Sequence, residues 1–268
     1  MSAPLISPAD LSQLTDDVVL LDGRPAADYA AGHLPSAHHA SLEQHLSAAA
    51  DPDFDPARGG RHPLPPVDRW LRQLAEWGIG PSTRVVVYDD QLGANAAARA
   101  WWMLRAVGCE NVSVLDGDWR EVTRAESEAP HARASMSDVV WKLPTVDSAR
   151  VDELRTRDDW RIIDVRSAPR FGGETEPIDP IAGHIPGAVN LPFAENLEGG
   201  HFKSPDALRR QYDNLLGDIN PSHVVVHCGS GVTACHTLLA LEAAGISGAS
   251  LYVGSWSEWC RNPFPREP

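Results

Sequence analysis

The sequence carries the same pattern twice, and this duplication limits the folds open to the chain. Four segments of the first half recur in the same order in the second half. The matched pairs are 18–25 with 160–167, 31–37 with 182–188, 85–89 with 224–228, and 114–119 with 251–256. Four matches in one order predict a duplicated domain.

Each half alternates short apolar runs with longer amphipathic ones. The expected strands are 18–22, 37–40, 85–89 and 112–115, then 161–165, 188–191, 223–227 and 250–253. The clearest expected helices are 67–77, 94–107, 205–215 and 233–244. This alternation predicts an α/β fold in which each half is a mostly parallel sheet with helices on both faces. We expect one domain over 1–125, a linker over 126–140 and a second domain over 141–268.

A cysteine stands at the most informative point of the second half. The β-branched run Val224–Val226 predicts a buried strand, which leads through His227 to Cys228. Gly229 and Gly231 permit a tight loop before the apolar helix that follows. Cys228 therefore lies at the carboxyl end of a strand and faces the amide end of a helix, where a thiolate or persulfide is stabilised. We expect a nucleophile; the alternative is an inert, buried cysteine.

The first half has Asp89 where the second half has Cys228. A carboxylate cannot form a persulfide, so we expect the first domain to be non-catalytic.

The run Cys228-Gly229-Ser230-Gly231-Val232-Thr233-Ala234 resembles the active-site loop of the two-domain sulfurtransferases of the rhodanese superfamily. Within that family it is similar to the 3-mercaptopyruvate branch, because the thiosulfate branch usually has a basic pair at the positions of Gly229 and Ser230. The resemblance implies transfer of a sulfane sulfur from 3-mercaptopyruvate, through a Cys228 persulfide, to a thiol or cyanide acceptor, with release of pyruvate. Two alternatives stay open: a thiosulfate:cyanide sulfurtransferase, and a non-catalytic persulfide carrier.

Cell-cycle phosphatases share this fold and give a third alternative. They need an arginine six positions after the cysteine, to clamp the phosphate. Ala234 stands there, so the sequence disfavours a phosphatase.

The resemblance also implies a set of site residues. Ser230 would form a proton relay with His62 and Glu43, although the family often has aspartate at the position of Glu43. Arg166 and Arg170 would bind the substrate carboxylate and carbonyl. The substrate would also meet loop residues Gly229, Gly231, Val232 and Thr233.

Alternatives remain for two of these residues, His62 and Arg166. His62 would equally suit a surface loop. Arg166 has a counterpart, Arg24, in the half that lacks the cysteine, so a structural salt bridge is an open alternative. Arg170 corresponds to Asp28 in the first half, which favours a role in substrate binding.

The formal charge of −14 argues against nucleic acid and anionic membranes as partners. A small anionic sulfur donor then needs a locally basic pocket. The four cysteines have no C-x-x-C spacing, so we expect no structural zinc site. The resemblance implies no metal or organic cofactor. The first residues contain no signal-like apolar run, and no membrane-length apolar stretch follows. We therefore expect a cytoplasmic enzyme, and the resemblance implies a thiol acceptor such as thioredoxin, or cyanide.

Overall fold

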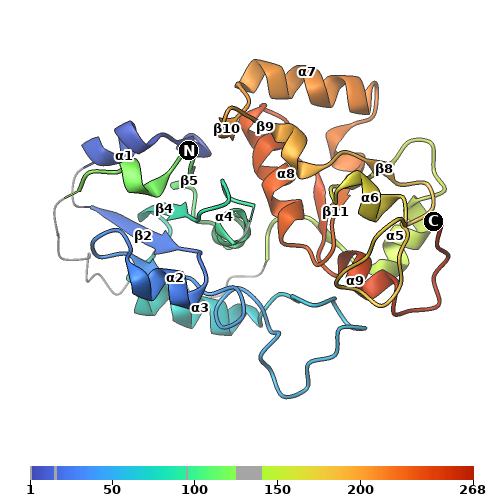
Figure 1. Ribbon diagram of the computed structural model, residues 1–268, viewed down its shortest axis with the longest axis horizontal. Coiled ribbons are helices and arrows are strands. Elements are labelled where there is room, and N and C mark those ends of the chain that lie inside the picture. Colours follow the sequence, from blue (N-terminus) through green and yellow to red (C-terminus); the bar gives the residue numbers. More distant parts are fainter. Residues whose placement is uncertain (1, 15–16, 95, 125–140) are drawn as a thin grey trace. The chain divides into compact units, whose positions relative to one another are not determined.

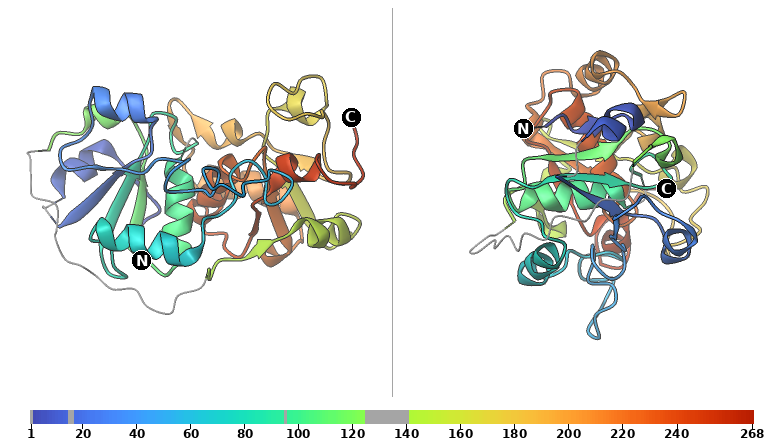
Figure 2. Two further views of the ribbon diagram at one scale, coloured as in Figure 1. Left: turned by 90° about the horizontal axis from the view of Figure 1, so that it is seen from below. Right: turned by 90° about the vertical axis from the view of Figure 1, so that its left-hand side faces the viewer.

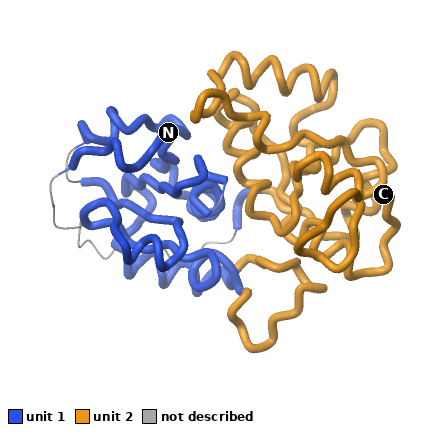
Figure 3. Tube along the Cα trace, in the orientation of Figure 1, with its two compact units in different colours: residues 1–48, 65–143 blue, residues 49–64, 144–268 orange. Residues whose placement is uncertain are grey.

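The computed structural model describes residues 2–14, 17–94, 96–124 and 141–268. The chain forms two compact units (Figure 3). Unit 1 comprises residues 1–48 and 65–143, and unit 2 comprises residues 49–64 and 144–268. Segment 49–64 thus groups with the second half of the chain. The expected linker, 126–140, lies outside the described residues, and the expected domain boundaries stay a prediction.

Unit 1 contains a five-stranded sheet in the order β1-β5-β4-β2-β3, with every pairing parallel (Figure 1). The strands are β1 (Leu5–Ile6), β2 (Val18–Asp22), β3 (His38–His39), β4 (Arg84–Tyr88) and β5 (Val112–Leu115). All five residues of β2 are buried, as expected for a strand covered on both faces.

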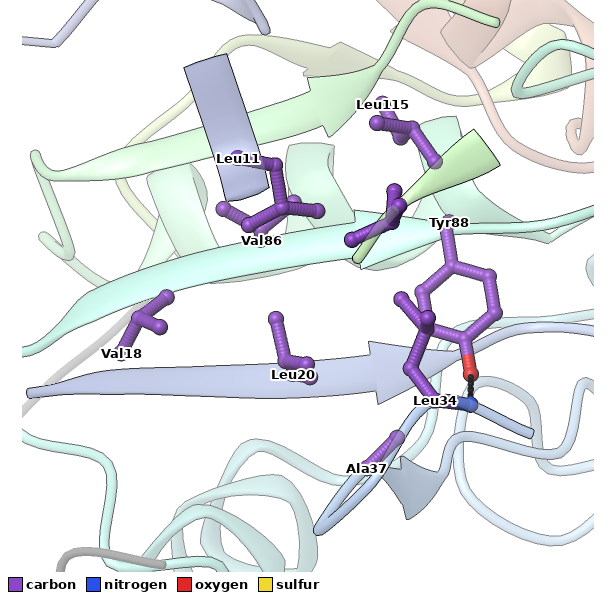
Figure 4. Close-up of a cluster of buried hydrophobic side chains, with 9 residues drawn as sticks. Leu11, Val18, Leu20, Leu34, Ala37, Val86, Tyr88 and Leu115 are labelled. Atoms are coloured by element: carbon purple, nitrogen blue, oxygen red, sulfur yellow. Dashed lines mark hydrogen bonds between the residues drawn. The ribbon is translucent and has the colours of Figure 1, made fainter. Parts of the chain in front are cut away.

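The helices of unit 1 are α1 (Pro8–Gln13), α2 (Ala26–Ala31), α3 (Val67–Glu76), α4 (Ala97–Ala106) and the 3₁₀ turn η1 (Trp119–Glu121). Alternate strand residues point to opposite faces. Val18, Leu20, Val86 and Tyr88 pack on one face with Leu11 of α1 (Figure 4). Helix α4 packs on β4 and β5. Helices therefore cover both faces of this sheet.

Unit 2 repeats this arrangement in the order β6-β12-β11-β7-β8, again with every pairing parallel. The strands are β6 (Thr145–Val146), β7 (Arg161–Asp164), β8 (Val189–Asn190), β11 (Val224–His227) and β12 (Ser250–Tyr252). A separate antiparallel hairpin joins β9 (Leu197–Glu198) to β10 (His201–Phe202). The repeated strand order confirms the expected fold class of two similar α/β domains.

The helices of unit 2 are α5 (Ser148–Leu154), α6 (Ala168–Phe171), α7 (Pro205–Leu216), α8 (Thr233–Ala243) and α9 (Ser255–Trp259), with 3₁₀ turns η2 (Phe193–Asn196) and η3 (Pro221–His223). Helix α8 packs along β11 and β12, and α7 packs on α8 (Figures 1 and 2). A second core cluster joins Val151 of α5 and Trp256 of α9 to Ile162 and Val225 of the sheet.

The expected central strands lie within a residue or two of the observed ones. The edge strands β1 and β6 were not expected, because two residues carry no periodic signal. The helix expected at 94–107 begins only at Ala97, since the preceding residues form the loop that surrounds Asp89. Within the described ranges, no helix is long and apolar enough to cross a membrane.

Candidate active site

Cys228 directly follows β11 and is 1% exposed. The residues around α9 fix its backbone: Cys228 N–H donates to Ser255 Oγ (3.1 Å), and Trp256 N–H donates to Cys228 O (3.0 Å). Gly231 has φ +75°, and a Cβ there would collide with the carbonyl oxygen of Val253. Glycine is therefore required at Gly231 for the loop to turn into α8.

Ser230, in this loop, contacts His62 of segment 49–64. Ser230 Oγ lies 2.8 Å from His62 Nδ1, although the two residues are 168 positions apart. Ser230 is buried, with 6% of its surface exposed. The pair has hydrogen-bond geometry suited to moving a proton.

Two long-range hydrogen bonds hold the segment that carries His62 within unit 2. Gly59 N–H donates to Glu258 Oε1 (3.1 Å), and Asn262 Nδ2 donates to Ala57 O (2.9 Å). Gly60 packs so tightly against Gly254 that a Cβ would collide with its carbonyl oxygen. These contacts explain why segment 49–64 belongs to the compact unit of the cysteine.

Two guanidinium groups lie against Gly229. A Cβ built on Gly229 would be 3.2 Å from Arg61 Nη2 and 3.4 Å from Arg170 Nη2. The side chains of Arg61 and Arg170 are 21% and 19% exposed, so water still reaches both. The loop itself is neutral, but these neighbours bring positive charge to the residue next to Cys228.

Two carboxylates hold these arginines. Glu176 Oε1 accepts from Arg170 Nη2 (2.7 Å), and Asp179 forms an ion pair with Arg61 Nη1 and accepts from Arg261 Nη1 (2.8 Å). Burial alone would raise the pKa of Asp179, but the guanidinium groups of Arg61 and Arg261 hold it below its usual range. Arg166 Nη1 also contacts Glu176 Oε2 (3.3 Å) and is itself paired with Asp164. Four arginines thus share three carboxylates, which leaves one positive charge uncompensated within this cluster.

Sequence reasoning missed Arg61, Glu176 and Asp179. A signal was present, because both carboxylates lie in the extra segment 171–180 that only the second half contains. Arg61 directly precedes His62, which the family resemblance had already marked.

Arg166 is engaged on several sides. Its guanidinium donates to Asp164 Oδ2 (2.6 Å) and to Gly183 O (2.9 Å), and it lies over the Trp256 ring (4.9 Å). Burial alone would lower the pKa of Arg166, but Asp164 raises it above its usual value.

Arg24 makes the same contacts in unit 1. It donates to Asp22 Oδ2 (2.6 Å) and to Gly32 O (2.6 Å), and it lies over Trp119 (4.1 Å). The shared contacts favour the structural alternative for Arg166, whose substrate-binding role stays a prediction.

Asp89 occupies the corner of unit 1 that corresponds to the cysteine position. Its carboxylate accepts hydrogen bonds from four backbone amides, those of Gln91 (2.9 Å), Gly93 (2.8 Å), Ala96 (3.2 Å) and Ala97 (3.1 Å). Burial raises the pKa of Asp89, and these amides oppose the rise. The strand–loop–helix corner in unit 1 thus holds an anion supplied by the chain itself.

His227, the last residue of β11, is fully buried beside Asp164, with Nε2 3.8 Å from Oδ2. Burial lowers the pKa of His227, and Asp164 only partly opposes this shift. The pKa of Asp164 lies below its usual range, because His227 and Arg166 outweigh the effect of burial.

The remaining expected site residues have simple surroundings. Glu43 lies in unit 1, where it is exposed and accepts a hydrogen bond from Ser41 Oγ (3.4 Å). Val232 and Thr233 form the start of α8, which has no side-chain cap. The roles expected for these three residues stay predictions. Among the described residues, no three His, Cys, Asp or Glu side chains gather as a metal ion would require.

Comparison with known proteins assigns the chain to a protein family. The family model of the rhodanese-like domain matches residues 7–125 and again 147–262. This chain belongs to the rhodanese-like family. The two matches bear out the resemblance read from the cysteine loop and the duplication read from the sequence.

Similar proteins carry two kinds of name. A probable 3-mercaptopyruvate sulfurtransferase of Pseudomonas aeruginosa is 39% identical, over 92% of this chain and 90% of the relative. A putative thiosulfate sulfurtransferase of Mycobacterium tuberculosis is 37% identical, over 97% of this chain and 94% of the relative. Among solved structures, the 3-mercaptopyruvate sulfurtransferase from Leishmania major superposes with a TM-score of 0.79 at 27% identity, covering 96% of this chain and 74% of that one. This rhodanese-like protein thus resembles sulfurtransferases along nearly its whole length.

Proposed function

We propose that this rhodanese-like protein is a sulfurtransferase that takes its sulfur from 3-mercaptopyruvate. The observation that carries the proposal is the loop after Cys228, in which Ser230 pairs with His62 at 2.8 Å and no basic residue occurs. A proton relay suits a leaving group that must be protonated, and the enolate of pyruvate is such a group. The names of the Pseudomonas and Leishmania proteins support the same substrate.

In the first step, the Cys228 thiolate attacks the thiol sulfur of mercaptopyruvate. A sulfur–sulfur bond forms and the carbon–sulfur bond of the substrate breaks. The electron pair of that bond passes to the pyruvate enolate, and a proton delivered through Ser230 and His62 completes pyruvate. Cys228 is left as a persulfide.

Arg61 and Arg170 supply the positive charge that an anionic donor needs. Both guanidinium groups lie against Gly229, the residue after the nucleophile. We assign them to the substrate carboxylate, because guanidinium groups bind carboxylates through paired, charge-assisted hydrogen bonds. This assignment adds Arg61 to the substrate-binding role expected for Arg170.

In the second step, an acceptor attacks the outer sulfur and the Cys228 thiolate leaves. A thiolate acceptor becomes a persulfide, and cyanide becomes thiocyanate. We propose a protein dithiol such as thioredoxin as the acceptor, in the reducing cytoplasm, since a dithiol can release the sulfur as hydrogen sulfide by closing its own disulfide. Unit 1 has Asp89 at the corresponding corner, so we propose that it is the non-catalytic domain.

Thiosulfate is the second candidate donor. The name of the Mycobacterium relative favours it, and the arginines beside Gly229 would attract a dianion. The two candidates are separated by measuring kcat/KM for both donors with one acceptor. We expect mercaptopyruvate to exceed thiosulfate by about a hundredfold or more, which corresponds to roughly 2.7 kcal/mol. Equal values, or a preference for thiosulfate, would refute the proposed donor, and absence of turnover with both would leave a persulfide carrier.

A further inference from the structure

Asp179 is surrounded by Arg61, Arg170 and Arg261. We assign it no direct contact with the substrate. We propose that it is a positioning residue, which holds the guanidinium of Arg61 against the cysteine loop. The proposal rests on the proposed function, since it concerns the binding of the anionic sulfur donor. It adds a specific residue from the extra segment 171–180 to that site.

Both carboxylate oxygens of Asp179 form ion pairs with arginines. Its carboxylate is 0% exposed and pairs with Arg61 Nη1 through Oδ2 and with Arg261 Nη1 through Oδ1 (2.8 Å). Arg170 Nη2 lies farther away, at 3.8 Å. A buried carboxylate with two close guanidinium partners fixes the position of both.

Arg61 reaches from this carboxylate to the loop. One terminal nitrogen, Nη1, pairs with Asp179, and the other, Nη2, lies 3.2 Å from the place where a Cβ of Gly229 would be. A flexible arginine with 21% exposure would otherwise have many orientations open to it. The pairing with Asp179 selects the one that points Nη2 at Gly229.

Asp179 is itself anchored to the elements that hold the loop. Arg261 Nη1 also donates to Ser257 O (2.7 Å) and to Ser257 Oγ (2.9 Å). Ser257 N–H in turn donates to Gly229 O (2.9 Å). Asp179, Arg61, Gly229, Ser257 and Arg261 therefore form a closed ring of contacts, which fixes the guanidinium relative to the loop.

Asp179 could instead serve only to neutralise buried arginines. The two roles predict opposite changes of charge beside Cys228 when Asp179 is replaced by Asn. If Asp179 only neutralises, its loss leaves the arginines in place and makes the site more positive. If Asp179 positions Arg61, its loss lets that guanidinium move into solvent and makes the site less positive.

The alkylation of Cys228 by iodoacetate and by iodoacetamide measures this charge. The ratio of the two rates reports the attraction for an anion, because both reagents attack the same thiolate and its abundance cancels. For Asp179→Asn we expect the ratio of iodoacetate to iodoacetamide to fall about fivefold, the size of one partly screened charge interaction. Asp179→Glu keeps the negative charge on a longer side chain. Its ratio of iodoacetate to iodoacetamide rates should therefore lie between those of Asp179→Asn and the wild type.

Asp213→Asn is the matched control, because Asp213 pairs with Arg209 at 2.8 Å on the exposed surface of α7. An unchanged or higher ratio in Asp179→Asn, or an equal fall in Asp213→Asn, overturns the proposal. If Asp179→Asn fails to fold, Asp179→Glu decides alone: a fall of about twofold or more supports positioning, and an unchanged ratio overturns it. Alkylation needs no mercaptopyruvate, so a protein that fails to turn over this donor would contradict the proposed function without affecting this result.

Discussion

His62 Nδ1 lies 2.8 Å from Ser230 Oγ, although the two residues are 168 positions apart in the sequence. Ser230 belongs to the loop that begins at Cys228. The sulfur donor proposed here depends on this pair. A hydroxyl next to an imidazole can pass a proton to a departing enolate, whereas sulfite leaving from thiosulfate needs no such proton.

Ser230→Ala should therefore lower kcat with mercaptopyruvate by about a hundredfold, the lower end of the effect of a positioned acid. His62→Gln should lower it to a similar extent, and the double variant should be little worse than either single one, because residues that act as a unit are not additive. Steady-state kinetics measure all three, with Ser222→Ala, at an exposed serine, as control. Additive losses would show that the two residues act separately.

Arg166 and Arg24 should behave alike on substitution. Arg166→Met and Arg24→Met each leave a buried aspartate, Asp164 or Asp22, without its ion-pair partner, a change that costs about 3–5 kcal/mol. Calorimetric melting should show a lower Tm for both variants. A normal Tm in Arg166→Met, together with a raised KM for mercaptopyruvate, would instead place Arg166 at the substrate.

Asp89→Ala should destabilise unit 1, because three buried amides, those of Gly93, Ala96 and Ala97, and the more exposed amide of Gln91 lose their common acceptor. A buried donor without a partner costs about 1–3 kcal/mol, so we expect a loss of at least about 3 kcal/mol in the free energy of unfolding. Formate, a free carboxylate, should bind in the vacated corner and raise the Tm of this variant more than that of the wild type. An equal response to formate in both proteins would contradict the anion-binding interpretation of this corner.

The stability of the wild type should decrease as the pH falls below the ordinary histidine pKa. Burial lowers the pKa of His227 from its usual 6.5, so the unfolded chain takes up the proton first. The stabilising contribution of neutral His227 is present above pH 6.5 and is lost as the pH falls toward the lowered folded value. Tm measured from pH 8 to pH 5 should fall more steeply for the wild type than for His227→Gln. His223→Gln, at a half-exposed histidine, is the control, and equal slopes for wild type and His227→Gln would refute this assignment.

Local pattern was sufficient to predict the fold. The runs that became β2, β4, β7 and β11 are apolar and β-branched, and their duplication predicts two copies of one topology. The position of Cys228 at the end of a strand followed from the same pattern, because strand, glycine loop and helix are adjacent in the sequence.

Local sequence patterns could not predict contacts between residues far apart in the sequence. Segment 49–64 joins unit 2 through Gly59 and Glu258, which are 199 residues apart. Nothing periodic marks that pairing. Arg61 and Asp179 were missed for the same reason. Each is significant because it pairs with the other across a long sequence separation, and the residues next to either one do not indicate this pairing.

The central claim is that Cys228 carries the sulfur taken from mercaptopyruvate. It is tested most directly by mass spectrometry of the protein after exposure to mercaptopyruvate without an acceptor, with Cys228→Ser as control. The account predicts the added mass of one sulfur atom on the peptide that contains Cys228, and none on the variant. No adduct, or an adduct only on Cys109, Cys235 or Cys260, which are all buried, would contradict it.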